Sequence, residues 1–173
     1  MLSMQNTIGL PIIEVEKGKT LGKVKDFLHD AQFILHGILV DTKRLTVAPR
    51  WIRWDQLVAI GEDAVTVKQA DSLEVWDDDE QLRPVFSGDE KWIGRPMITI
   101  NGHQLGIVED VYLGNHLERN IVGYELSDGF ITDVMEGRKC LPAFEQFTFG
   151  EDAILVPVQS EGKLQTLQQF TKK

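Results

Sequence analysis

The sequence contains one phrase twice, and this repeat constrains the fold more than any other feature. Gly18-Lys-Thr-Leu-Gly-Lys-Val-Lys-Asp-Phe27 returns 84 positions later as Gly102-His-Gln-Leu-Gly-Ile-Val-Glu-Asp-Val111. Four ordered matches with a slowly drifting offset are typical of two copies of one fold that differ by loop insertions. The other three matches have offsets of 85, 86 and 89: Ile8-Gly-Leu-Pro11 with Ile93-Gly-Arg-Pro96, His36-Gly-Ile-Leu-Val40 with Val122-Gly-Tyr-Glu-Leu126, and Gly61-Glu-Asp-Ala-Val65 with Gly150-Glu-Asp-Ala-Ile154.

Each copy has the residue pattern of short β-strands, because runs of Val, Ile, Leu, Thr and Phe alternate with Gly, Pro, Asn and Asp. No segment inside either copy shows helical periodicity. So few antiparallel strands bury an inner face only by curling, which predicts a small barrel for each copy. Gly22 and Gly106 lie inside strand patterns and are predicted to mark a bulge or bend. We expect strands near 11–15, 21–29, 33–41, 51–60 and 63–68, then near 96–100, 105–113, 120–127, 138–149 and 153–158.

The repeat predicts the domain organisation. The first barrel is expected over residues 1–70, an acidic linker over 71–91, the second barrel over 92–158 and a tail over 159–173. The tail carries Leu164, Leu167 and Phe170 at helical spacing, so we expect a short C-terminal helix. The run Asp77-Asp-Asp-Glu80 lacks the alternating ligands of a calcium loop and indicates a solvated linker, although the surrounding apolar residues predict that the linker packs.

The order of these motifs resembles the PRC-barrel family, here in tandem over residues 7–70 and 92–158. The shared features are an I-G-x-P opening, then G-x-x-L-G-x-V-x-D, then a hydrophobic strand with Gly, and a last strand closing on G-E-D-A. The family includes the cytoplasmic barrel of the photosynthetic reaction-centre H subunit and the C-terminal domain of a ribosome-maturation factor. The resemblance implies an all-β fold of two tandem small antiparallel β-barrels, used as an interaction module with no family-wide active site.

Charge is distributed unevenly along the chain of 173 residues, which carries a net charge of −9. Residues 7–70 hold 9 basic and 8 acidic groups. Residues 71–91 hold 2 basic and 8 acidic groups, and residues 92–158 hold 4 basic and 10 acidic groups. The total charge therefore describes solubility better than it describes what the first copy contacts. A single cysteine, Cys140, the lack of a secretory signal and the lack of a membrane-length apolar run predict a cytoplasmic protein that does not span a membrane.

Asp26 and Asp110 hold the same place in the two copies, and alternation puts each on the inner side of its strand. An acid–base pair is one interpretation. We favour a structural one, in which each buried carboxylate accepts backbone N–H groups at a bulge, because the two residues belong to separate barrels.

The sequence predicts neither a catalytic site nor a cofactor. The four histidines and Cys140 lack the local paired spacing of zinc ligands, so we expect no metal. No phosphate-binding loop, dinucleotide fingerprint or nucleophile motif is present in the sequence, which argues against an enzyme. The histidines are His29, His36, His103 and His116.

Basic residues of the first copy form the candidate partner-binding surface. Lys23 and Lys25 alternate with inward-facing residues and should point outward, whereas the second copy has Ile107 and Glu109 at these positions. Such a surface steers an acidic partner or RNA phosphates; the alternatives are an ordinary solvated face, which we favour, or one neutralised by the acidic linker. Nearby residues assigned to the surface are Arg50, Trp51, Arg53 and Trp54, with Lys17, Lys19, Lys43 and Arg44 in neighbouring loops or strand starts.

The two tryptophans leave three roles open: exposed stacking partners for RNA bases, core residues, or a seal between the barrels.

Together these observations favour a non-enzymatic cytoplasmic adaptor for a protein or ribonucleoprotein partner. The alternative function is a sensor with a small ligand or metal between the barrels. Direct RNA contact is less favoured, and the formation of a homodimer stays open.

Overall fold

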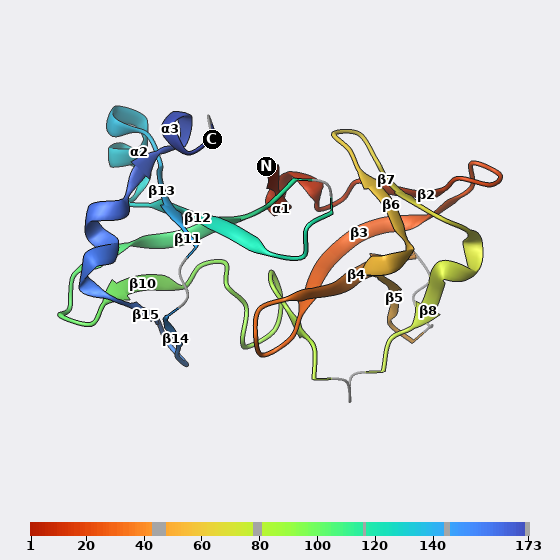
Figure 1. Ribbon diagram of the computed structural model, residues 1–173, viewed down its shortest axis with the longest axis horizontal. Coiled ribbons are helices and arrows are strands. Elements are labelled where there is room, and N and C mark those ends of the chain that lie inside the picture. The colour runs from red at the N-terminus through yellow and green to blue at the C-terminus, as the bar shows by residue number, and fades with distance from the viewer. Residues whose placement is uncertain (43–47, 78–80, 116, 144–145, 172–173) are drawn as a thin grey trace.

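The computed structural model describes residues 1–42, 48–77, 81–115, 117–143 and 146–171, and its fold is all-β with two tandem barrel-like units. Figure 1 shows the units side by side, with the N-terminal segment between them. The first unit comprises β2 (Pro11–Glu14), β3 (Thr20–His29), β4 (Leu35–Asp41), β5 (Arg50–Arg53), β6 (Leu57–Ile60), β7 (Val65–Val67) and β8 (Leu73–Val75). The second comprises β10 (Pro96–Thr99), β11 (Gln104–Leu113), β12 (Ile121–Ser127), β13 (Lys139–Pro142), β14 (Thr148–Phe149), β15 (Ile154–Val156) and β16 (Gln165–Thr166).

The two sheets have the same strand order, which confirms the tandem fold predicted from the repeat. The first runs β6-β7-β2-β3-β4-β5-β8 and the second runs β14-β15-β10-β11-β12-β13-β16. Neighbouring strands are antiparallel except for the pairs β2–β7 and β10–β15, which are parallel. The parallel pairs join the first strand of each unit to a strand much later in the chain, so they curl each sheet back toward its beginning.

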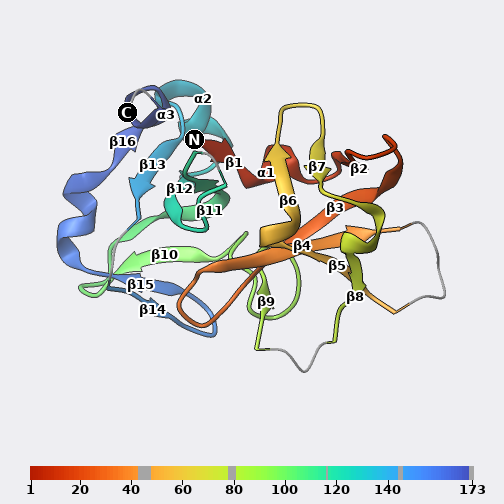
Figure 2. The ribbon, with the colours of Figure 1, turned by 45° about the vertical axis from the view of Figure 1, so that its right-hand side comes forward.

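Each sheet also receives one short strand from a segment that precedes the other unit. The strand β1 (Leu2–Ser3) comes before the first unit in the chain but pairs with β11 of the second. The strand β9 (Arg83–Pro84) comes before the second unit but pairs with β3 of the first. The helix α1 (Met4–Thr7) follows β1 and lies between the units (Figure 2). The units are therefore tied together by reciprocal crossings; the limits 1–70, 71–91, 92–158 and 159–173 stay a prediction.

Equivalent bulges shape the two central strands. The register of β3 shifts between Val24 and Asp26, and that of β11 shifts between Val108 and Asp110. Before the bulge, buried and exposed residues alternate; after it, the residues from Asp26 to His29 are all buried. A second pair of register shifts lies beside Gly22 and Gly106, where β2 pairs with β3 and β10 pairs with β11.

One connected hydrophobic core runs through both units. It includes Val24, Ile38 and Ile52 from the first unit and Val108, Leu126 and Leu141 from the second, with Trp92 among them. The second halves of β3 and β11 are buried on both faces. Phe27 and Val111 pack in this common core, whereas Leu28 packs with Leu39, Trp51 and Trp76, and Tyr112 packs with Cys140 and Phe170.

Three expectations about local structure were wrong. The segment 51–60 is not one strand, because a 3-10 turn at Trp54–Gln56 separates β5 from β6. The segment 138–149 contains the separate strands β13 and β14. The second unit contains a helix, α2 (Phe130–Glu136), bracketed by Gly129 and Gly137, which have φ of 107° and 78°. The helix begins after Gly129 and ends before Gly137. A search for apolar residues at helical spacing does not detect such glycine limits.

The remaining helical elements are short. The C-terminal helix α3 (Leu167–Thr171) confirms the helix expected in the tail, and Phe170 is its buried residue. The 3-10 turns at Ala70–Ser72 and Val158–Lys163 lie between β7 and β8 and between β15 and β16. None of the helices in the described ranges is long and apolar enough to cross a membrane.

Gly37 on β4 lies where no side chain fits, and its replacement by alanine tests this packing. A Cβ atom at Gly37 would come within 2.5 Å of the Ile52 carbonyl oxygen and 2.7 Å of Trp51 Cε3. We expect Gly37→Ala to lower the free energy of unfolding by about 1–3 kcal/mol, because backbone and ring have to move apart. Urea denaturation measures the change. Gly162→Ala is the control, since nothing lies within 4 Å of a Cβ there; equal losses in both variants would contradict the packing argument.

Candidate functional site

Lys23 and Lys25 are exposed on β3, on the side opposite the buried Val24 and Asp26. They face solvent from the centre of the first sheet. Lys23 lies directly across the ladder from Asp41, whereas Lys25 and Arg50 line a common pocket of 280 Å³. Asp41 also lines that pocket, so its carboxylate offsets part of the positive charge of Lys23, Lys25 and Arg50.

Arg53 is exposed at the end of β5, with its Nε atom 3.6 Å from a carboxylate oxygen of Asp55. The side chains of Arg53 and Asp55 are about half exposed, so solvent screens this pair. Arg53 lines a different pocket from the one that Lys25 and Arg50 share. Lys23, Lys25, Arg50 and Arg53, which the sequence assigned to one surface, are called the basic face below. Lys17 and Lys19 are exposed in the turn before β3. Lys43 and Arg44 lie outside the described residues.

Trp51 and Trp54 are buried, with exposed fractions of 8% and 4%. Trp51 packs with Leu28, Leu39 and Trp76 beneath the first sheet. Trp54 belongs to the common core and donates its indole N–H to the Leu117 carbonyl of the second unit at 2.8 Å. Neither ring is therefore an exposed stacking platform on the surface of the sheet. Trp54 instead joins the two units, and Trp51 supports the strands that carry Arg50 and Arg53.

Asp26 fastens the linker to the first unit. Its Oδ1 atom accepts backbone N–H groups from Phe27 at 2.7 Å and from Val85 and Phe86 at 3.0 Å each. Its Oδ2 atom accepts the Ser87 hydroxyl at 2.7 Å. Burial raises the pKa of Asp26, and the four hydrogen bonds oppose that shift. The carboxylate thus holds three consecutive linker residues beside the bulge of β3.

Asp110 fastens the N-terminal segment to the second unit in the same manner. Its Oδ1 atom accepts N–H groups from Gln5 at 2.9 Å and from Val111 at 2.7 Å, and its Oδ2 atom accepts the Ser3 hydroxyl. Burial also raises the pKa of Asp110. The two carboxylates have no partner in common, so each acts as an anchor for a different chain crossing.

An aromatic cluster joins the units on one side of their contact. Trp92 is fully buried, and its ring stacks on Tyr124 with centroids 5.2 Å apart. Its indole N–H donates to His29 Nε2 at 3.2 Å, so His29 Nδ1 carries the proton that is donated to the Asp30 carbonyl at 2.8 Å. Burial lowers the pKa of His29, which keeps this imidazole neutral. Phe33, Phe147 and Phe149 complete the cluster.

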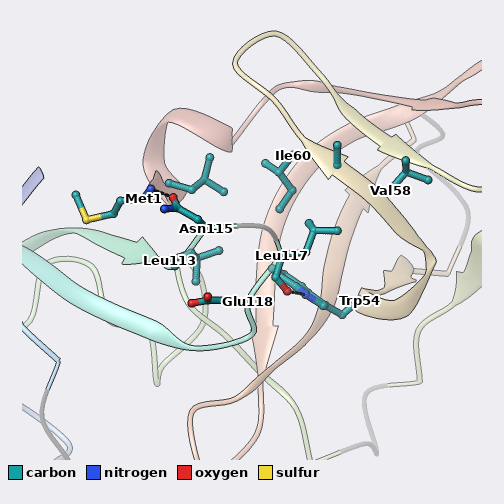
Figure 3. Close-up of a pocket in the computed structure, with 11 residues that line it drawn as sticks. Met1, Trp54, Val58, Ile60, Leu113, Asn115, Leu117 and Glu118 are labelled. Carbon is teal, nitrogen blue, oxygen red and sulfur yellow. Dashed lines mark hydrogen bonds between the residues drawn. The ribbon is translucent and has the colours of Figure 1, made fainter. Parts of the chain in front are cut away.

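A pocket of 400 Å³ lies on another side of the same contact, as Figure 3 shows. One wall is the strand β6 with Trp54, and the other walls come from β1, the end of β11 and the following loop. Nothing in the repeat pattern pointed to this pocket or to Trp92, because both arise from side chains that differ between the copies. Its lining residues are Met1, Leu2, Trp54, Val58, Ala59, Ile60, Leu113, Gly114, Asn115, Leu117 and Glu118.

The described residues contain no group of three or more His, Cys, Asp or Glu side chains placed to hold a metal ion. His36 Nε2 lies 2.8 Å from an Asp30 carboxylate oxygen, and His103 Nδ1 lies 3.5 Å from one of Glu161. His116 and residues 78–80 of the acidic run fall outside the described residues. Cys140 is buried, and this burial raises the pKa of its thiol to about 12, so the nucleophilic thiolate is disfavoured.

Comparison with known proteins found a family match for the first part of the chain. Residues 1–74 match the family model of the PRC-barrel domain. The second unit lies beyond this match but repeats the strand order of the first. The comparison with curated proteins found no match.

Proposed function

Because residues 1–74 belong to the PRC-barrel family, whose small β-barrel modules are often involved in protein interactions, we propose that this protein is a non-enzymatic adaptor. Its working surface in this proposal is the basic face of the first unit. The partner is an acidic protein surface or a ribonucleoprotein, which the lysines and arginines attract by charge. The proposed place of action is the cytoplasm.

The observation that carries this proposal is the difference between the two units at one pair of positions. Lys23 and Lys25 are exposed on the central strand β3, and the second unit has Ile107 and Glu109 at the matching positions of β11. The folds are the same, so the lysines are not required to build a unit of this kind. Trp51 and Trp54 are buried, so this proposal assigns partner contact to the charged side chains and not to the two rings.

A sensor for a small ligand is the second candidate, because the pocket between the units has space for one. Among the described residues, its lining contains one acidic side chain, Glu118, and no histidine. These residues do not supply the donor set of a metal site, so the sensor candidate is restricted to a small organic ligand.

The adaptor proposal predicts that Lys23→Glu/Lys25→Glu loses partner binding. The double variant reverses the charge of the central part of the basic face, so we expect at least about a tenfold loss of captured partner at low salt. Affinity capture from a prokaryotic lysate, with protein and RNA both identified, measures this at low and moderate salt. RNA as the direct partner would show a steep fall of affinity with salt.

Lys91→Glu/Lys163→Glu is the matched control, because it makes the same change of charge at exposed positions outside the basic face. Circular dichroism checks that both double variants are folded. Recovery of the same partners by wild type and by Lys23→Glu/Lys25→Glu would show that the basic face is only solvated.

A further inference from the structure

The pocket between the units lies along the unpaired edge of a strand. Val58, Ala59 and Ile60 are consecutive on β6, and all three line the pocket. The register of β6 against β7 shifts between Leu57 and Ala59, so Val58 lies at a bulge beside the pocket. The other edge of β6 pairs with β7, and β6 ends the sheet in the described part of the chain. Its backbone N–H and C=O groups on the pocket side form a template for another strand.

The opposite wall of the pocket is already an example of strand addition. Leu2 of β1 pairs with Leu113 of β11, and both residues line the pocket. Here a segment of two residues joins a sheet edge through main-chain pairing, as β9 does on β3. The pocket therefore continues an interface in which short extended segments are held by β-strand pairing.

The repeat shows why the pocket is open. Phe33 and Leu117 are equivalent, 84 positions apart, and share a positive φ of 62° and 60°. Phe33 contacts Phe147 beside the edge strand β14, with ring centroids 4.6 Å apart. In the first unit, the positions that match Phe147 and Phe149 at an offset of 89 are Val58 and Ile60. Aromatic rings thus meet on one side of the contact, whereas the smaller aliphatic side chains of Val58, Ile60 and Leu117 line the pocket on the other (Figure 3).

We propose that this pocket binds a short extended peptide of a partner protein, which pairs its main chain with β6 and inserts one aromatic side chain between Ile60, Leu117 and Trp54. The aromatic ring takes the place that Phe147 and Phe33 fill on the other side of the contact. The lining carries charges of both signs, the N-terminal ammonium of Met1 and the Glu118 carboxylate, so the proposal assigns no charge to the peptide. Binding by strand addition of this kind obtains affinity from the main chain and specificity from the pocket. This site is separate from the basic face.

A selection with defined probes tests the proposal. A phage-displayed library of random linear heptapeptides is selected on the full chain, with counter-selection on Val58→Phe/Leu117→Phe. This filled variant carries phenylalanine at the two positions that match Phe147 and Phe33. Phe33 shows that phenylalanine tolerates the backbone at the position of Leu117. We expect enriched peptides with one aromatic residue among strand-forming residues, bound at least about tenfold more weakly by the filled variant.

Val15→Phe/Ile100→Phe is the control, since these aliphatic residues are exposed away from the pocket, with exposed fractions of 54% and 71%. It should bind the selected peptides as wild type does, and so should Lys23→Glu/Lys25→Glu. Amide chemical shifts of the wild-type chain locate the peptide independently of any variant, and we expect changes at residues 57–60 and 117. Failure to enrich any peptide, equal binding by the filled variant, or shift changes at another surface would overturn the proposal.

Discussion

Asp26→Ala is expected to lower the free energy of unfolding by about 3–5 kcal/mol, because three backbone N–H groups and one hydroxyl lose their acceptor together. Two of these N–H groups belong to Val85 and Phe86, whose segment crosses from the linker to the first unit. Val85 is fully buried, so water cannot replace the carboxylate there without opening the contact. Urea denaturation followed by fluorescence and by circular dichroism measures the loss.

Asp26→Asn is the matched variant, because it keeps the shape and most of the hydrogen bonds. The amide oxygen can accept the N–H groups that Oδ1 accepts, and the amide nitrogen can donate to the Ser87 hydroxyl. We therefore expect a change of no more than about 1 kcal/mol. Similar large losses in both variants would show that the charge, and not the set of hydrogen bonds, anchors the linker.

The difference in the free energy of unfolding between wild type and Asp26→Asn is expected to depend on pH. Burial raises the pKa of Asp26 above its ordinary value of 3.8, so its contribution to stability is fully present below pH 3.8 and is lost as pH rises through the folded-state pKa. Asparagine does not titrate. The free energy of unfolding of wild type minus that of Asp26→Asn should therefore decrease as pH rises from about 4 to 7. A difference that increases over this range would mean that the folded state lowers the pKa.

Trp92→Ala is expected to lower the free energy of unfolding by about 3–5 kcal/mol, as is usual when a fully buried tryptophan becomes alanine. The ring contacts Tyr124 of the second unit and His29 of the first, and it donates a hydrogen bond to His29. The variant should therefore loosen both units. Thermal unfolding measures the loss, and amide hydrogen exchange shows where it acts: we expect faster exchange in β3 and β4 as well as in β11 and β12.

Trp76→Ala is the control for this prediction. Trp76 is also buried, with an exposed fraction of 9%, but it packs in a separate cluster with Leu28, Leu39 and Trp51 of the first unit. Its loss should speed exchange in the first unit and leave β11 and β12 unchanged. Faster exchange confined to the second unit in Trp92→Ala would show that Trp92 does not couple the two units.

The sequence predicted the features that depend on local alternation. Exposed Lys23 and Lys25 beside buried Val24 and Asp26 follow from the two-residue period of a strand. The tandem fold followed from the repeat, because two segments with the same order of strands and turns form the same sheet. Helix α2 was missed, since its limits depend on Gly129 and Gly137 rather than on an apolar period. The breaks within 51–60 and 138–149 were missed because strand-like composition continues across them.

Sequence by itself therefore determined that this chain forms two β-units of one design, with a carboxylate and a bulge at the same place in each. Only the tertiary structure decided how the units meet. Residues 1–7 cross to the second unit, and the linker crosses to the first, so segments far apart in the chain lie together. Neither segment has a local sequence pattern that predicts which strand it pairs with. Residue size decided the rest: aromatic rings close one side of the contact around Trp92, while Val58, Ile60 and Leu117 leave a pocket on the other.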